Sequence, residues 1–263
     1  MEEGDILVGA DGVYSRTRRQ YLPDHTPCDM HARSIYGKTL ITSDLLERFK
    51  KDATEWMTLI MDNKTVCLTL EMIRLPEDPA IALPGILASV KDYIYWVLGT
   101  RASGLPADYK LFSLAPQQTA TLTLNITEDW HPSIRSLLEL QQSDRTSVVR
   151  ITSVEPDLPV WESSKVTLLG DAVHCMPPTG GVGANTALRD AALLSECLKN
   201  KGLDGIPEYE SQMRDYSKQM IEASLGAMKH FGLSIDGAKP VQYRLEKVSL
   251  GEGQLDSELS PLC

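Results

Sequence analysis

The chain has 263 residues, 42% of them hydrophobic and 24% charged, which is the composition of an ordinary folded domain. Its formal net charge of -10 disfavours general binding to nucleic acid or to an anionic membrane. No apolar run approaches the roughly 20 residues of a membrane-spanning helix, and the acidic N-terminus has no signal-peptide pattern. The five cysteines show no CxxC or zinc spacing, so we expect no metal site and a reducing, cytoplasmic location.

The N-terminal half predicts a short α/β segment followed by many strands. Residues 5–8 read as a strand, residues 9–12 as a turn and residues 15–21 as a short basic helix. Between about residues 30 and 125 the pattern becomes strand-like, with runs at 34–41, 56–61, 65–73 and 93–99. We expect a turn at 62–64 and a surface loop at 76–84.

The C-terminal half predicts helices around two strands. Residues 127–142 show helical spacing, residues 148–154 a strand, and residues 166–169 a buried strand. A long helix is expected over residues 207–231, and the polar segment after Gly237 offers little core.

The buried strand at 166–169 runs into a glycine-rich loop and then a helix. Gly170 lets the chain leave the strand sharply, and Pro177 and Pro178 stiffen the loop. Three glycines (Gly180, Gly181 and Gly183) allow the backbone to approach a ligand closely, and Asn185 is a candidate cap of the following helix. Strand, loop and helix N-terminus together predict a seat for an anion or a cofactor.

Asp171, directly after this strand, sharpens the prediction. A carboxylate at the end of a strand and beside a helix N-terminus suits the hydroxyl groups of a ribose or ribityl chain. The structural alternative is that Asp171 only caps the turn. No Lys-Ser or Lys-Thr follows the glycines, so the loop is not a P-loop.

These motifs resemble those of FAD-dependent monooxygenases of the aromatic-hydroxylase type, including salicylate-hydroxylase-like and zeaxanthin-epoxidase-like members. Gly170-Asp171 with its Pro-Pro and Gly-Gly-Val-Gly continuation is similar to the family's "GD" motif. The segment from Asp5 to Ser15, containing Asp11-Gly12, is similar to its "DG" motif, and the two occur in the family's order.

The resemblance implies an α/β fold: an incomplete Rossmann-like FAD-binding layer, an inserted β-sheet substrate domain and C-terminal helices. Residues 1–29 and 127–235 would form the FAD-binding part, residues 30–126 the β-rich substrate part, and residues 236–263 a loose tail. NAD(P)H would reduce FAD, and O₂ would supply one oxygen atom to hydroxylate or epoxidise a small organic substrate, as in secondary-metabolite tailoring or aromatic catabolism.

The resemblance also assigns cofactor contacts. Asp171 would bind the ribityl hydroxyls, and the helix starting near Asn185 would point its positive end at the flavin, where the reduced ring is negative. Backbone at 180–184 would contact the pyrophosphate or ring, and Asp11-Gly12 would help to position pyrophosphate, ribose or NAD(P)H. The expected cofactor-binding set is Asp11, Gly12, Asp171, Pro177, Pro178, Gly180, Gly181, Gly183, Ala184 and Asn185.

Other positions carry open alternatives. Arg33 and Tyr36 are candidates for the substrate pocket, although both fit ordinary strand positions. His174 is expected to be structural rather than catalytic. Two further groups of residues also remain ambiguous. Arg18 and Arg19 fit a solvated helix face or a nicotinamide contact, and the aromatics Tyr93, Tyr95 and Trp96 fit an apolar pocket or plain packing.

The 263 residues contain no Gly-x-Gly-x-x-Gly, the family's seat for the ADP half of FAD. The sequence therefore leads us to expect the C-terminal part of a monooxygenase. A non-catalytic remnant, a subunit whose partner chain supplies the βαβ unit, and a flavin-dependent reductase on the same fold remain alternatives.

Overall fold

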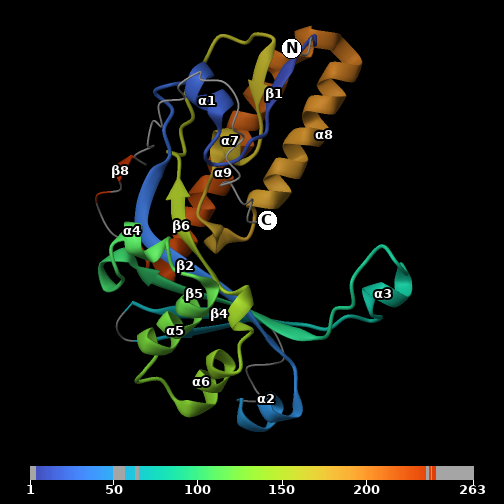
Figure 1. The fold of residues 1–263 in the computed structure, drawn as a ribbon. Coiled ribbons are helices and arrows are strands. Elements are labelled where there is room, and N and C mark those ends of the chain that lie inside the picture. Colours follow the sequence, from blue (N-terminus) through green and yellow to red (C-terminus); the bar gives the residue numbers. More distant parts are fainter. Residues whose placement is uncertain (1–3, 50–56, 63–64, 235–236, 238, 241–263) are drawn as a thin grey trace, which may run out of the picture.

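The computed structural model describes residues 4–49, 57–62, 65–234, 237 and 239–240. Helices and strands form two layers of structure, one built on a six-stranded sheet and one on a parallel strand pair with long helices (Figure 1). This arrangement confirms the expectation of a fold that mixes helices with sheet.

The larger sheet is antiparallel, with strand order β3-β4-β5-β2-β6 and with β8 paired to β2. Its strands are β2 (Cys28–Leu40), β3 (Thr58–Met61), β4 (Cys67–Ile73), β5 (Tyr93–Arg101), β6 (Ser147–Ser153) and β8 (Lys239–Pro240). In the register, Tyr36 lies opposite Val97 on one side and Ser147 on the other. The strand-like runs of the sequence are thus confirmed, with shifted ends.

One face of this sheet is packed with apolar side chains beneath three helices, α2 (Ser43–Arg48), α5 (Pro116–Ile126) and α6 (Pro132–Glu139). Its fully buried centre includes Ile35, Trp96 and Leu98. The Trp96 indole N–H donates to Thr39 Oγ1 at 3.2 Å. Gly37 fits this layer because a Cβ there would lie 2.2 Å from the Trp96 ring. Trp96 is therefore a core residue, so of the two alternatives for it plain packing holds and the apolar pocket does not.

The prediction of a single helix over residues 127–142 is wrong. Residue Thr127 caps the C-terminal end of α5, and a new helix, α6, begins at Pro132. Each of these helices starts with a proline, which suits a first helical position because no N–H is needed there. Leu137 and Leu138 of α6 belong to the core of the large sheet.

The second layer is built on β1 (Leu7–Gly9) and β7 (Val166–Leu168), which pair in parallel. Around them lie α1 (Arg16–Tyr21), α7 (Asp171–His174), α8 (Gly183–Lys201) and α9 (Ile206–His230), and the 3₁₀ turns η4 (Pro178–Gly180) and η5 (Gly202–Gly205). Their core includes Leu168, Val173, Tyr209 and Met213. The helix expected over 207–231 is confirmed within one residue at each end.

The end of α9 joins the two layers. Met228 and Leu233 pack with Ala32, Cys67 and Ile151 of the large sheet. This contact lies on the sheet face opposite to α5 and α6, so α9 and α7 stand above that face in Figure 1. Short elements α3 (Pro79–Ala82), α4 (Asp108–Leu111), η2 (Ala102–Gly104) and η3 (Ser143–Arg145) complete the described chain.

Within the described ranges, we find no helix that combines the length and the apolar character required to cross a bilayer.

Candidate functional site

The turn between β7 and α7 is held by a buried hydrogen-bond network. Gly170 has φ of +62°, a conformation that favours glycine, and its N–H donates to Asp190 Oδ2 at 2.7 Å. The same oxygen lies 2.6 Å from His174 Nε2, and Tyr216 donates its hydroxyl to Asp190 Oδ1 at 2.5 Å. His174 and Asp190 are fully buried, so His174 has the structural role expected of it.

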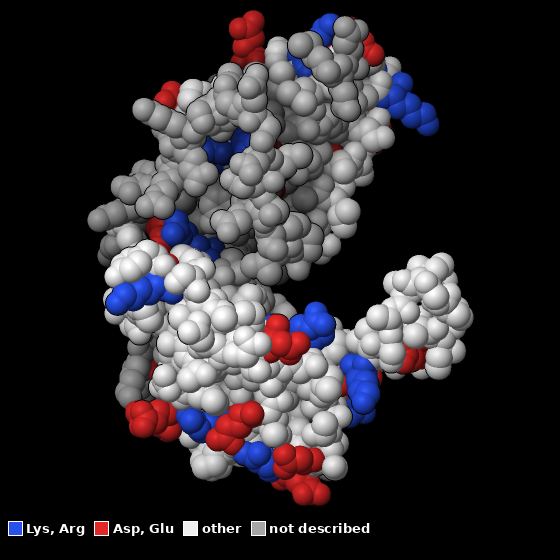
Figure 2. Space-filling model, viewed as in Figure 1, with Lys and Arg blue, Asp and Glu red and all other residues white. Residues whose placement is uncertain are grey.

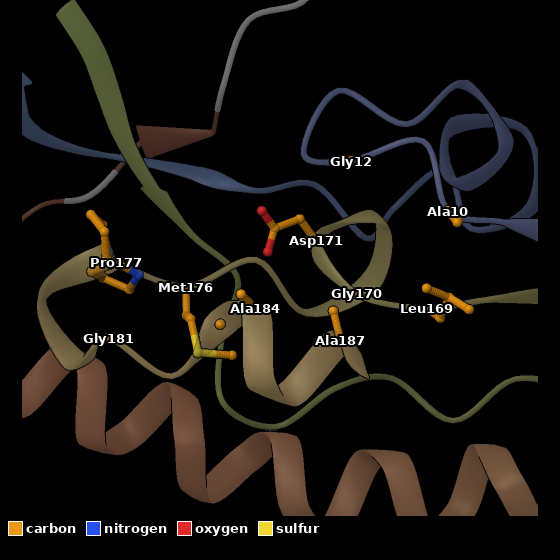
Figure 3. Close-up of a pocket in the computed structure, with 12 residues that line it drawn as sticks. Ala10, Gly12, Leu169, Gly170, Asp171, Met176, Pro177, Gly181, Ala184 and Ala187 are labelled. Carbon is orange, nitrogen blue, oxygen red and sulfur yellow. The ribbon is translucent and has the colours of Figure 1, made fainter. Parts of the chain in front are cut away.

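Directly at this turn lies an open pocket of about 520 Å³ (Figure 3). Glycine, alanine and proline dominate its wall, which therefore presents backbone and small apolar groups to a ligand. The lining residues are Ala10, Gly12, Leu169, Gly170, Asp171, Met176, Pro177, Pro178, Gly181, Gly183, Ala184 and Ala187. The structure thus gathers both sequence motifs around one cavity.

The loop glycines differ in what a side chain would meet. At Gly181, with φ of +64°, and at Gly183 the protein leaves room: a Cβ would meet no atom within 4 Å at the first and only Met176 Cγ, at 3.8 Å, at the second. Both line the pocket, so a ligand would occupy the space that a side chain would take. Gly180 instead faces α9, where a Cβ would lie 2.4 Å from Ser224 Oγ.

The N-terminus of α8 lies at this pocket. Its helix begins at Gly183 with Val182 as the N-cap residue, and the first amide bonded to a carbonyl of its own turn is Thr186 N, 2.9 Å from Val182 O. The N–H groups of residues 183–185 precede that ladder and carry the positive end of the helix dipole. Asn185 lies inside this first turn, so its prediction as the helix cap is wrong.

Asp171 is exposed at the pocket, and its carboxylate points into the open space of Figure 3. Although the side chain is open to the pocket, the protein around it partly desolvates the carboxyl and raises its pKa, and the attraction of His174 offsets only part of that rise. Among the described residues none donates a hydrogen bond to it. The carboxylate is therefore available to hydroxyl donors of a ligand.

Asp11 behaves differently, because its carboxylate already has partners. It accepts hydrogen bonds from the Ser15 hydroxyl at 2.5 Å, from Arg16 N at 2.7 Å and from Thr17 N at 3.2 Å, at the start of α1. Burial alone would raise the pKa of Asp11, but these hydrogen bonds outweigh it and lower the pKa. Of this turn, Ala10 and Gly12 line the pocket.

Arg18 is fully buried and donates to the carbonyls of Ala172, at 3.0 Å, and Val13, at 2.9 Å. It therefore connects α1 with α7 from inside the protein, and the expectation of a solvated helix face is wrong for it. Arg19 donates to Ser15 O at 3.3 Å on its own helix.

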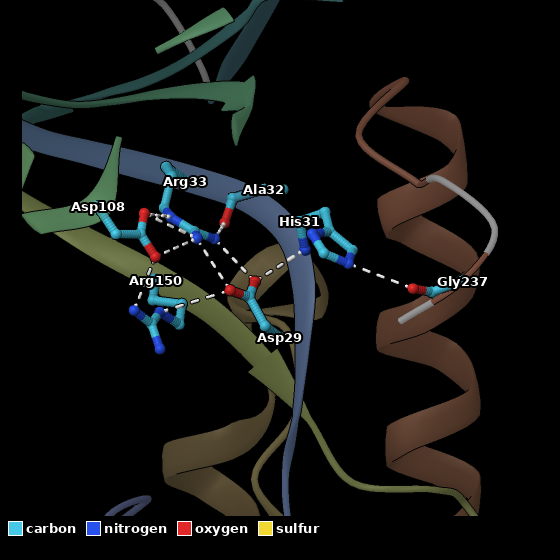
Figure 4. Close-up of polar contacts among 7 residues, drawn as sticks. All are labelled: Asp29, His31, Ala32, Arg33, Asp108, Arg150 and Gly237. Atoms are coloured by element: carbon cyan, nitrogen blue, oxygen red, sulfur yellow. Dashed lines mark hydrogen bonds and ion pairs between the residues drawn. The ribbon is translucent and has the colours of Figure 1, made fainter. Parts of the chain in front are cut away.

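The substrate-pocket candidate Arg33 is part of a four-membered ion-pair network (Figure 4). Its guanidinium binds Asp29 at 2.8 Å and Asp108 at 2.8 Å, while Arg150 binds the same Asp108 at 2.8 Å. Asp29 lies at a bulge of β2, beside His31 with its φ of +53°. Two cations and two anions balance one another, so Arg33 is committed to structure at this junction.

Tyr36 is the other candidate. Its side chain points to the face of the large sheet opposite to the one that carries Ile35 and Trp96. It is half-buried, its ring centre lies 6.1 Å from that of Tyr95, and burial raises its pKa. Lys38 stands 5.1 Å above the Tyr93 ring on the same face. Tyr36, Tyr93 and Tyr95 therefore form an aromatic group on the side of the sheet that α9 reaches.

Five pocket residues were absent from the predicted cofactor-binding set: Ala10, Leu169, Gly170, Met176 and Ala187. Each of them belongs to a motif, is next to a motif residue in the chain, or lies one helical turn from one. This adjacency is the sequence signal that could have identified them.

The described residues hold no group of three or more His, Cys, Asp or Glu side chains placed to bind a metal.

A strand, a glycine-rich loop, a helix N-terminus and an available carboxylate define a site of the class that binds a nucleotide-type cofactor. Comparison with known proteins specifies the class, since residues 3–224 match the FAD binding domain family. The chain belongs to this family.

The similar proteins include bifunctional fungal enzymes. The chain is 38% identical over 253 residues to the dual O-methyltransferase/FAD-dependent monooxygenase CTB3 of Cercospora beticola, covering 87% of this chain and 29% of that protein. It is 44% identical to the similarly described elcB of Phaeosphaeria nodorum, covering 74% of this chain and 23% of that protein. The chain therefore spans about a quarter of the length of these relatives.

Among solved structures, a Photorhabdus luminescens protein described as an FAD-containing monooxygenase superposes with a TM-score of 0.75 at 30% identity. The match covers 89% of this chain and 62% of that one. A salicylate hydroxylase with bound substrate superposes with a TM-score of 0.66 at 19% identity, covering 89% and 56%, and shows the fold alone.

Proposed function

We propose that the chain is the part of an FAD-dependent monooxygenase that holds the flavin and the organic substrate. NAD(P)H and O₂ are the co-substrates, and the reaction is hydroxylation or epoxidation of a small organic molecule. The observation that carries this proposal is the pocket in which Asp171, Gly181 and Gly183 meet the N-terminus of α8.

The residues present fit the flavin half of the cofactor. Bound FAD supplies the redox and oxygen chemistry, and the chain supplies its seat. Asp171 accepts hydrogen bonds from ribityl hydroxyls, and the α8 N-terminus stabilises negative charge on the reduced ring. Pro177 and Pro178 shield one side of the seat from water, while Ala10 and Gly12 approach it from the β1 side.

The substrate lies on the sheet face that bears Tyr36 and Tyr95. Thr179 of the pocket loop donates to Ser224 O of α9 at 2.8 Å, and the end of α9 packs on that same face. α9 thus connects the flavin pocket with the open face and sets their relative position. Aromatic side chains there suit an aromatic or otherwise planar substrate.

The chain then consists of a flavin-binding part and a substrate-binding part. Residues 4–29 and about 154–234 form a partial Rossmann-like layer for FAD, and the sheet between them forms the substrate part. Residues 127–142 join the substrate part, because α6 packs in its core. Among the described residues β1 pairs with β7 alone, and we propose that a further parallel strand, from the same polypeptide or from a partner chain, pairs with its other edge.

Flavin titration tests the proposal. The chain is titrated with FAD and FMN, and flavin fluorescence is followed for the wild type and Asp171→Ala. Flavin binding that depends on Asp171 supports the proposal. Binding of ADP with no binding of either flavin contradicts it.

A reductase on the same fold is the second candidate function. Incorporation of oxygen into the product during NAD(P)H oxidation distinguishes the two: a monooxygenase transfers one oxygen atom of O₂ to the substrate, whereas a reductase passes electrons to its acceptor without incorporating oxygen. Labelled O₂ with mass analysis of the product gives the answer.

A further inference from the structure

The β4–β5 connection forms an ordered arm with an apolar tip. Residues 79–88 read Pro-Ala-Ile-Ala-Leu-Pro-Gly-Ile-Leu-Ala, ten residues without a polar side chain. Four large side chains are strongly exposed: Ile81 65%, Leu83 48%, Ile86 76% and Leu87 46%. Such a run is unusual on a protein surface and indicates a contact that the free chain does not make.

The neck of the arm is built to hold it in place. Asp78 accepts hydrogen bonds from Ala80 N at 3.0 Å, Val90 N at 3.3 Å and the Ser89 hydroxyl at 2.5 Å, which join the two sides of the neck. Asp92 accepts from Leu75 N at 3.1 Å one step closer to the sheet. The arm is thus a projecting element with a fixed root.

The arm is rooted at the end of the open sheet face. In β5, Ile94, Trp96 and Leu98 point into the core, so Tyr93, Tyr95 and Gly99 point to the other face. Gly99 lies under Leu233 beyond the end of α9, while Tyr93 ends the strand beside the arm. At roughly 3.3 Å per residue, the floor between them is about 20 Å long.

This floor carries exposed apolar side chains together with Lys38 and Glu71, the cross-strand partners of Tyr95. Leu59, Met61 and Tyr95 on it are 41%, 48% and 37% exposed. Figure 2 shows a hollow between the sheet layer and the arm; the tip of the arm is mostly white, and acidic and basic side chains lie at the edge of the sheet layer. The apolar tip of the arm and the exposed apolar side chains of the floor therefore border the same hollow.

We propose that the arm is the outer wall of the substrate chamber and that it selects an extended, fused-ring aromatic substrate over a single-ring one. The inference rests on the proposed monooxygenase function for its assignment of the sheet face to substrate. A single ring stacked on Tyr36 and Tyr95 covers only part of the floor, whereas a fused-ring system starting there extends past Tyr93 to the arm. Contact between ring and arm removes apolar surface of both from water.

Binding of phenol, 2-naphthol and 2-hydroxyanthracene tests this, measured by equilibrium dialysis with the 263-residue chain. The arm variant carries Ile81→Ser, Leu83→Ser, Ile86→Ser and Leu87→Ser and retains the Asp78 neck. Val160→Ser, at a side chain 83% exposed outside the arm, is the control. We expect the arm variant to lose about tenfold or more in affinity for 2-hydroxyanthracene, with phenol unchanged.

Equal binding of 2-hydroxyanthracene by wild type and arm variant would overturn the proposal. So would loss of phosphatidylcholine-vesicle binding, or of dimers, in the arm variant with no change in ring binding, because the arm would then serve a lipid surface or a second copy. Flavin affinity is measured in parallel and should be the same in wild type and arm variant. Failure of both FAD and FMN to bind would reject the proposed function, whereas failure of the ring-size dependence would reject the arm's role alone.

Discussion

Two turns of this molecule present an aspartate next to a glycine, and they use the carboxylate in opposite ways. Asp11 is occupied by the hydroxyl of Ser15 and two amides of α1, and its pKa is lowered. Asp171 stands exposed at the pocket, without a hydrogen-bond donor among the described residues, and its pKa is raised. The Asp11 carboxylate stabilises the turn before α1, whereas the Asp171 carboxylate is open to a ligand in the pocket.

The comparison shows why a motif is an incomplete description of a site. Both turns contribute to the pocket wall, but the first does so through Ala10 and Gly12 and the second through its glycines and the carboxylate. A polar residue with all its partners inside the protein has little left to offer a cofactor. Residues that border open space and lack hydrogen-bond partners within the protein are the better candidates for binding a cofactor.

The largest effect is expected at Gly183. Gly183→Val places a branched side chain in the pocket, where only Met176 Cγ is near, so the protein should retain its stability while flavin affinity falls more than about a hundredfold. Gly180→Ala is the matched control, because its Cβ meets Ser224 and should cost about 1–3 kcal/mol of stability. Flavin titration and urea unfolding of both variants provide the measurements.

If Gly183→Val instead lowered stability and left flavin binding unchanged, the loop would be a structural turn and would not belong to the cofactor site.

Removing the carboxylates comes next. Asp171→Ala should lower flavin affinity about tenfold to a hundredfold, since hydrogen bonds to a charged group contribute about 1.5–3 kcal/mol. Asp11→Ala should leave most of that affinity and lower the free energy of unfolding by about 0.5–2 kcal/mol, the range for a lost helix cap. Equal losses of flavin affinity in the two variants would show that the Asp11 and Asp171 carboxylates do not differ in their role.

Much of the fold follows from local sequence pattern, as β5, β6 and α9 illustrate. The misjudged elements depended on partners distant in sequence or on turn chemistry. Helix 127–142 was drawn through Pro132, which in fact begins a helix. Arg33 was a candidate for the substrate pocket, with an ordinary strand position as the alternative, and only the fold brings Asp108, which is 75 positions away, to its guanidinium.

The candidate site was predicted in outline because its residues are contiguous. Gly181, Gly183 and Asp171 all line the pocket, whereas Gly180, an identical neighbour, faces α9. No sequence rule separates Gly180 from Gly181, because the difference lies in where Ser224 stands. The assignment of all these residues to FAD stays a prediction.

A smaller effect is expected in the network that fixes the second turn. Tyr216→Phe removes the donor to Asp190 Oδ1 in a buried setting, which should lower the free energy of unfolding by about 1–3 kcal/mol. His174 and the Gly170 amide still hold the other oxygen, so the pocket should keep its shape and flavin affinity should change less than in Asp171→Ala. Urea unfolding of Tyr216→Phe measures the loss of stability, and flavin titration measures the change in affinity.

The smallest effect is in the pH dependence of flavin binding. Ionised Asp171 accepts hydroxyl hydrogen bonds, so flavin affinity should rise with pH through the pKa of this carboxyl and fall on acidification. Because burial raises that pKa, the fall should begin at a higher pH than for an ordinary aspartate, whose pKa is about 3.9.

The same group has the opposite sign in the stability of the free protein. A carboxyl whose folded pKa is raised binds its proton more tightly when folded, so its contribution to stability is greatest at low pH and is lost as pH rises. Asp171→Asn should therefore flatten the pH profile of flavin binding and also remove this stability slope, whereas Asp11→Asn should leave the binding profile intact. A profile of flavin affinity that is as steep in Asp171→Asn as in the wild type would assign the pH dependence to another group and leave Asp171 as a turn residue.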